Sequence, residues 1–194
     1  MSQLCQLGDV KNYLGVTAST TDSVLLSLIT NASSAIESYC NRTFLLGSYT
    51  ETRNGTGGYR ISPYNAPVIA VSTVSVDGIP IPAAPPLNGS GSITYGYLFD
   101  SDLIYIRGGL PYSGQPYVFN QGIQNVYLAY SAGYATIPAD VSQACIELVA
   151  SKFGKRDRID RKNEVLAQQT VGYDLSAMPE SVKNALAVYR RWTQ

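Results

Sequence analysis

The sequence predicts an α+β protein: a small helical bundle built from the N- and C-terminal helices, with an antiparallel β module inserted between them. Apolar residues recur at helical spacing near both ends of the chain, whereas the middle is rich in Gly, Pro, Ser and Thr and in short β-branched runs. The middle shows no alternation of strands and helices, so its sheet is expected to be antiparallel. We therefore expect N-terminal bundle helices in residues 1–46, the β module in 47–130, and the completing helices with a C-terminal tail in 131–194.

Two helices are expected before the β module. Asp9 opens the short segment DVKNYLG, and Gly15 ends it. A helix of about 20 residues follows, with Thr20 or Thr21 as its N-cap and Asp22 in its first turn. Its apolar stripe consists of Val24, Leu25, Leu28, Ile29, Ala32, Ile36, Tyr39 and Cys40. Since one helix cannot bury such a stripe alone, the helices from the two chain ends are expected to pack together.

The β module is expected to contain several short strands. They are PVIAVSTVSV (67–76), SITYGYLF (92–99), LIYIR (103–107) and NVYLAY (125–130). The pair Asp77-Gly78 predicts a type I′ hairpin turn, because both central residues of that turn need positive φ. RNGTGGYR (53–60) is interpreted as a hairpin tip, and the pair Asp100/Asp102 as a polar turn. The long loop 107–125 is expected to be functional or to become ordered at a partner surface.

Helices are expected to return after the β module. Pro138 suits a first helical position and Asp140 a first turn. The apolar stripe of this helix consists of Val141, Ala144, Cys145, Leu148 and Val149. A polar connector, QQTVGYDLSAM (168–178), precedes a last helix that begins at Pro179. Its expected stripe is Val182, Ala185, Leu186 and Tyr189.

The residue types present do not favour catalysis or a bound cofactor. The chain has no histidine, which removes the commonest general base and a common metal ligand. No phosphate-binding glycine loop or nucleophile elbow occurs, so we expect no catalytic residue, no cofactor and no metal site. The three cysteines Cys5, Cys40 and Cys145 are odd in number and lack CxxC spacing, which indicates neither a disulfide framework nor a zinc site.

Composition favours extensive contact with other proteins. Charged residues make up 14% of the chain, against about 25% in an average soluble protein, while tyrosine occurs 15 times. Tyrosine suits both protein interfaces and half-buried strands, so a covered surface and a Tyr-rich sheet are equally open interpretations. No secretory signal and no apolar run of about 18 residues is seen, so we expect a soluble protein of a reducing compartment with no membrane association.

The segment KFGKRDRIDRKNEV (152–165) concentrates basic residues, including Arg156, Arg158 and Arg161. Acidic residues are interleaved with them, and Asp157 and Arg161 form a favourable (i, i+4) pair if the helix continues. Three interpretations remain open: a protein contact, a surface facing DNA, or a solvated helix end. An alternative function is a DNA-binding accessory module acting through residues 152–162. An extracellular binding module built from residues 47–130 would need a secretion route, which the sequence does not indicate.

Three stretches in the expected order resemble one protein family. They are YSAGYATIPADVSQACIELVA (130–150) followed by KFGKRDR, the opening LGDVKNYLGV with DSVLLSLITNASSAIESYCNRTF (22–44), and the closing TVGYDLSAMPESVKNALAVYRR (170–191). Together they are similar to the head–tail connector (adaptor, or head completion) proteins of long-tailed bacteriophages. The resemblance covers the helical parts at both ends, and the β insertion matches in type more than in detail.

This resemblance implies a structural virion protein located in the neck and made in the host cytoplasm. Members of the family form a ring, typically of twelve copies, beneath the portal protein; the ring extends the DNA channel and docks the next neck or tail component, a stopper or tail-terminator protein. Contact with the packaged DNA in the lumen is then transient and non-specific. The resemblance also implies that the C-terminal segment docks on the portal, here with Tyr189, Arg190, Arg191 and Trp192. Arg156, Arg158 and Arg161 are expected at a subunit or portal contact.

Overall fold

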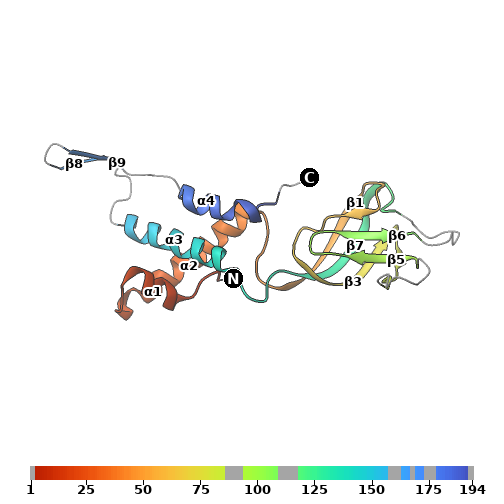
Figure 1. Cartoon of the computed structure of the whole chain (residues 1–194), viewed down its shortest axis with the longest axis horizontal. Helices are drawn as coiled ribbons and strands as arrows, with labels where there is room; N and C mark the ends of the chain where they lie inside the picture. Colours follow the sequence, from red (N-terminus) through yellow and green to blue (C-terminus); the bar gives the residue numbers. More distant parts are fainter. Residues whose placement is uncertain are drawn as a thin grey trace. The chain divides into compact units, whose positions relative to one another are not determined.

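The computed structural model describes residues 3–85, 94–108, 118–156, 163–166, 169–172 and 178–191. The chain divides into two compact units: a helical unit, Met1–Arg42 with Thr136–Gln194, and a β unit, Thr43–Ala135. Figure 1 shows both, with helices from the two chain ends in one unit and antiparallel strands in the other. The predicted α+β class, with terminal helices and an inserted β module, is confirmed.

The helical unit is organised around one central helix. Its elements are α1 (Leu7–Leu14), η1 (Ser19–Thr21), α2 (Asp22–Cys40), α3 (Ala139–Lys155), α4 (Glu180–Leu186) and η3 (Ala187–Tyr189). Helix α3 contacts α1, α2 and α4, so helices from both chain ends bury their apolar sides against it. This packing is the reason short helices persist, because isolated helices of such length are marginal in water.

The C-terminal ends of α1 and α2 carry left-handed caps, but α1 begins at Leu7, two residues before the expected start at Asp9, which lies in its first turn. Gly15 ends α1 with a left-handed φ of 67°, and Asn41 ends α2 in the same conformation with φ 52°. Thr21 occupies the N-cap position of α2. Within the expected stripe Leu25, Ile29, Ala32, Ile36 and Cys40 are buried, but Val24 is 41% exposed. Ser33, which was not in the expected stripe, is also buried.

The helices after the β unit match the expected stripes in part. Pro138 stands at the N-cap of α3, one residue earlier than expected, and all five expected stripe residues of α3 are buried. Helix α4 is shorter than predicted, and Ala185 is exposed rather than buried. A seven-residue helix buries one face through two side chains an (i, i+4) step apart, here Val182 and Leu186.

The β unit consists of two antiparallel sheets. Its strands are β1 (Gly47–Gly55), β2 (Arg60–Ile61), β3 (Val68–Val76), β4 (Ile79–Ile81), β5 (Gly96–Phe99), β6 (Ile104–Arg107) and β7 (Gly122–Ala132). The larger sheet has the order β1-β7-β3-β4 and the smaller the order β2-β6-β5. Their apolar side chains form one core, in which Phe119, Ile104, Leu128, Val74, Val76 and Val126 have no exposed surface. The four predicted strand regions all lie in strands of these sheets, although β5 covers only the end of 92–99 and residues 86–93 lie outside the described ranges.

Two of the three predicted turns in the β unit are confirmed, and the third is wrong. The Asp77-Gly78 turn is confirmed, since both residues have positive φ (52° and 77°) between the paired strands β3 and β4. Asp100 accepts hydrogen bonds from the N–H groups of Asp102 and Leu103 in the turn between β5 and β6, as expected. The hairpin tip predicted at 53–60 is wrong: β1 pairs with β7 and β2 pairs with β6, so this segment joins two sheets.

Two further segments differ from expectation. Strand β7 begins at Gly122, inside the expected loop 107–125, and Phe119 of that loop is fully buried. Residues 109–117 of the loop lie outside the described ranges. The expected polar connector 168–178 contains a strand that was not predicted: Gln169–Gly172 forms β9, paired antiparallel with β8 (Asn163–Leu166).

The chain enters and leaves the β unit through two adjoining segments. The N–H of Leu46 donates to the carbonyl of Tyr134, and the N–H of Tyr134 donates to that of Phe44. The rings of Phe44 and Tyr134 stack, with centroids 6.4 Å apart. Gly133, at φ 110°, allows this close approach, because a Cβ there would lie 2.4 Å from the carbonyl oxygen of Leu45.

Candidate interaction surfaces

The larger sheet presents an uncharged outer face. Residues directly opposite one another on neighbouring strands share a face, and the register of β1, β7 and β3 gives three rows on the side away from the core. The rows are Ser48–Ser131–Ala70, Thr50–Ala129–Thr73 and Thr52–Tyr127–Ser75. None of these nine residues is charged, although solvent-facing sheet surfaces ordinarily carry polar and charged side chains. We refer to these nine residues as the uncharged sheet face.

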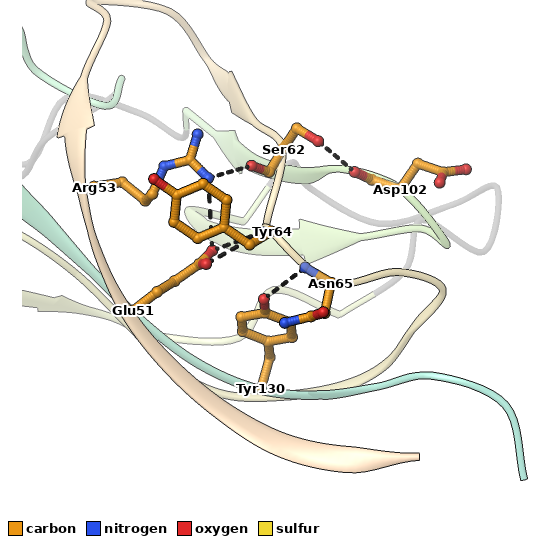
Figure 2. A network of polar contacts seen from close by, with 7 residues as sticks. All are labelled: Glu51, Arg53, Ser62, Tyr64, Asn65, Asp102 and Tyr130. Atoms are coloured by element: carbon orange, nitrogen blue, oxygen red, sulfur yellow. Dashed lines mark hydrogen bonds and ion pairs between the residues drawn. The ribbon is translucent and has the colours of Figure 1, made fainter. Parts of the chain in front are cut away.

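The two charged residues within the strands of the larger sheet, Glu51 and Arg53, point to the other side and are paired there. Figure 2 shows both beside the segment that follows β2. The Glu51 carboxylate accepts the N–H of Tyr64 at 3.2 Å, and Arg53 donates to the carbonyl of Ser62 at 3.1 Å. The Arg53 guanidinium also lies 3.9 Å from the centre of the Tyr64 ring. These contacts use both charges to hold one segment, so the sheet face itself stays neutral.

The same network fixes the segment to the core. The N–H of Asn65 donates to the Tyr130 hydroxyl at 3.1 Å, and the Ser62 hydroxyl donates to the carbonyl of Asp102 at 3.3 Å (Figure 2). Burial raises the pKa of Tyr130 to about 12, so this phenol is protonated at neutral pH. The arrangement is structural: its groups bond one another rather than converging on a space for a ligand.

The C-terminal segment expected to dock on a partner is attached to the helical unit at several points. The Tyr189 hydroxyl donates to the Asp140 carboxylate at 2.8 Å, at the start of α3. Arg190 lies over the ring of Tyr39 at 5.3 Å, and the N–H of Arg191 donates to the carbonyl of Cys40. Val188, between the buried Leu186 and Tyr189, is 88% exposed. Trp192 lies outside the described residues.

The two groups of candidate arginines do not form one site. Arg156 follows the last residue of α3 and lies 4.6 Å from the ring of Phe153. Tyr189 contacts Asp140, in the first turn of the same helix, so the two groups are separated by about 24 Å at 1.5 Å per helical residue. Arg158 and Arg161 lie outside the described residues, so their expected contacts stay predictions.

The rest of the described part of the chain carries few groups suited to catalysis or metal binding. No group of three or more Cys, Asp or Glu side chains there is arranged to hold a metal ion. No helix in the described part of the chain is long and apolar enough to span a bilayer. Burial raises the pKa of the Cys40 thiol to about 11, which keeps it protonated and poorly nucleophilic at neutral pH.

Comparison with known families identifies the chain. The family model described as "Head completion protein" matches residues 3–192, nearly the whole sequence. The chain belongs to the head completion protein family. A head completion protein is a structural component of the virion, so the resemblance noted in the sequence, and the virion location that it implied, are confirmed by the family.

Three solved structures share the fold of this head completion protein. The neck of an empty gene transfer agent (GTA) particle, computed with C6 symmetry, aligns with a TM-score of 0.59 at 19% identity, covering 98% of this chain and 91% of that one. The neck of the native GTA particle, computed with C12 symmetry, gives 0.55 at 19%, covering 97% and 89%. The virion of the native gene transfer agent gives 0.58 at 17%, covering 98% and 91%. A search of curated proteins gave no match.

Proposed function

We propose that this head completion protein forms a ring in the neck of the virion, beneath the portal, that extends the DNA channel and docks the next neck or tail component. Family membership supports a structural role in the head, and the structural neighbours come from particle necks treated with six- and twelve-fold symmetry. Twelve copies are accordingly the expected number. Packaged DNA passes through the lumen with transient, non-specific contact.

The uncharged sheet face is the main structural observation that supports ring formation. A subunit in a closed ring buries two flanks against its neighbours, and the cores of such interfaces are depleted of charge. The small side chains of its outer rows, Ser, Thr and Ala with one Tyr, allow a flat surface to approach another closely. We assign this face to one flank of the subunit.

Placing a charge at the centre of that face tests the assignment. Thr50→Arg puts an unpaired cation into the interface, so co-expression with the cognate portal should no longer give a ring of twelve by native mass spectrometry. Ser101→Arg, on an exposed turn of the same unit, is the matched control and should assemble normally. A complete ring with the Thr50→Arg variant would remove the sheet face from the interface. If the wild-type protein forms no complex with the portal, the proposed function itself is overturned.

The C-terminal segment supplies the proposed portal contact. Removing residues 178–194 would test this poorly, because Val182 and Leu186 are fully buried in the helical unit. Val188 is exposed between fixed neighbours, so Val188→Asp should weaken portal binding at least ~10-fold without unfolding the chain. Val24→Asp, on the exposed side of α2, is the control that should bind normally. Equal binding by both variants would place the docking site elsewhere.

The basic stretch belongs to the same proposal as a second contact with a neighbouring subunit or the portal. Charge reversal at Arg156, Arg158 and Arg161 should then reduce assembly with little effect on DNA affinity. Steep, salt-dependent DNA binding that this triple variant abolishes would instead favour the DNA-binding accessory module.

A further inference from the structure

Two cysteines far apart in the sequence meet inside the helical unit. The Cys5 thiol donates to the Cys145 sulfur, with the two sulfur atoms 3.2 Å apart. Cys5 is 4% exposed and Cys145 has no exposed surface. Cys5 lies just before α1 and Cys145 lies in α3, so this contact joins the N-terminal segment to the central helix of the unit.

The surrounding contacts hold the two sulfur atoms close to each other. The N–H of Leu4 donates to the Ser33 hydroxyl at 3.1 Å, and that hydroxyl lies 3.7 Å from the Cys145 sulfur. Leu4 itself is buried, so residues on both sides of the peptide bond before Cys5 are anchored. A disulfide needs an S–S distance of about 2.05 Å, so closing the remaining gap takes a sulfur shift of roughly 1.2 Å.

We propose that Cys5 and Cys145 are a cross-linking site, whose two thiols are converted to a disulfide by a small-molecule disulfide oxidant such as oxidised glutathione. In the first step a Cys5 thiolate attacks the oxidant and one glutathione leaves as its thiol, taking up the proton. In the second step the Cys145 thiolate displaces the other glutathione, again released as the thiol. Two protein thiols are thereby oxidised and one disulfide of the oxidant is reduced to two thiols.

Access to the pair comes through the N-terminal segment. The hydrogen bond to Cys145 raises the pKa of the Cys5 thiol, and burial adds to this, so the closed state reacts slowly. Residues 3–6 precede the first helix, so exposing Cys5 requires only local opening that breaks the Leu4–Ser33 hydrogen bond and the burial of Leu4 and Cys5. Opening of these few residues exposes Cys5 while α3 stays packed. The reaction is therefore limited by local opening rather than by global unfolding.

In a virion protein, this disulfide would form when the particle leaves the cell. The time of formation rests on the proposed function, whereas the chemistry of the two thiols does not. The chain is made in a reducing cytoplasm, where both thiols persist, and then leaves the cell in a particle exposed to oxidising surroundings. A disulfide there closes a loop that contains the entire β unit and ties the chain start to α3. Such a long closed loop strongly restricts the unfolded chain.

The third cysteine provides a matched control. Cys40 is also fully buried in the helical unit, but it lies at the end of α2 and no sulfur contact joins it to either of the others. Incubating the full-length protein with oxidised glutathione should remove two hydrogen masses from the wild type and from Cys40→Ser. Peptide mapping should join the Cys5 peptide to the Cys145 peptide. The thermal midpoint should rise by at least ~5 °C and return on reduction.

Cys5→Ser and Cys145→Ser should not lose the two hydrogens and should at most gain a glutathione adduct. Peptide mapping of the wild type decides the matter even if a variant folds poorly. A wild-type protein that gains only glutathione adducts, stays unmodified, or links Cys40 would overturn the proposal. Because this experiment needs no portal, its outcome is independent of whether the ring forms.

Discussion

The two units of the molecule differ in where they keep charge. The β unit holds seven charged residues, namely Glu51, Arg53, Arg60, Asp77, Asp100, Asp102 and Arg107, while the helical unit holds the other 21. The β unit also holds eleven of the fifteen tyrosines. Scarce charge with abundant Tyr is a composition that protein interfaces share with half-buried sheets. The low charge of the whole chain is therefore mainly a property of one unit.

The cores differ as well. The β unit buries β-branched and aromatic side chains, among them Phe119 and Tyr130, between its two sheets. The helical unit buries aliphatic residues together with all three thiols and the Ser33 hydroxyl. Thiol reactivity thus reports on the helical unit alone, and each unit can be perturbed and followed separately.

The largest effect is expected from emptying the core of the β unit. Phe119→Ala removes a ring with no exposed surface and should lower the free energy of unfolding of that unit by about 3–5 kcal/mol. Urea unfolding followed by tyrosine fluorescence measures the loss. Labelling of the three cysteines by a thiol reagent in native buffer should keep its wild-type rate. Accelerated labelling would mean that the two units unfold as one.

The mirror experiment truncates the helical core. Leu186→Ala in α4 should cost about 2–4 kcal/mol, since its side chain is fully buried against the unit. Here labelling of the cysteines should speed up while the tyrosine-detected transition stays in place. Val188→Ala, two residues along the chain and 88% exposed, is the control and should change stability by less than about 0.5 kcal/mol.

A smaller, pH-dependent effect is expected at the β3–β4 turn. Hydrogen bonds from Asn120 and then Asn125 hold the pKa of the Asp77 carboxyl below its ordinary value of 3.8. Their contribution to stability is complete above that pH and is lost as the pH falls through the lowered pKa. Asp77→Asn keeps a residue that tolerates positive φ but removes the carboxylate.

Chemical denaturation across pH 3–7 checks this sign. Wild type should exceed Asp77→Asn by a constant margin above about pH 4, and the margin should shrink below it. Asp9→Asn removes one carboxylate from the helical unit and serves as the charge-matched control. A margin that grows on acidification would show that the amide–carboxylate contacts do not stabilise the turn.

Features set by neighbouring residues could be predicted from the sequence. The buried positions of α3, the glycine that ends α1 and the Asp77-Gly78 turn depend on spacing or on local φ, which a linear pattern records. The prediction at residues 53–60 failed because Gly-rich turns look alike whether they join strands of one sheet or of two. The strand β9 was not predicted because QQTVG is polar and short. Only its pairing with β8 identifies it as a strand.

The candidate surfaces were less predictable. Composition left a covered surface and a Tyr-rich sheet equally open, and the uncharged sheet face can be recognised only once the register sets Thr50 beside Ala129 and Ala129 beside Thr73. The Cys5–Cys145 contact likewise depends on α1 and α3 packing together. The number and spacing of cysteines in the sequence do not predict it. Val188 lies outside the expected stripe of the last helix, but its 88% exposure is seen only in the structure.

The backbone segments Phe44–Leu46 and Tyr134 are hydrogen-bonded to each other where the chain enters and leaves the β unit. The loops of that unit therefore lie between joined ends. Loops there can lengthen, shorten or be exchanged as a cassette while α2 and α3 keep their spacing. The surface of the β unit can thus diverge in sequence while the helices built from the two ends of the chain keep their packing.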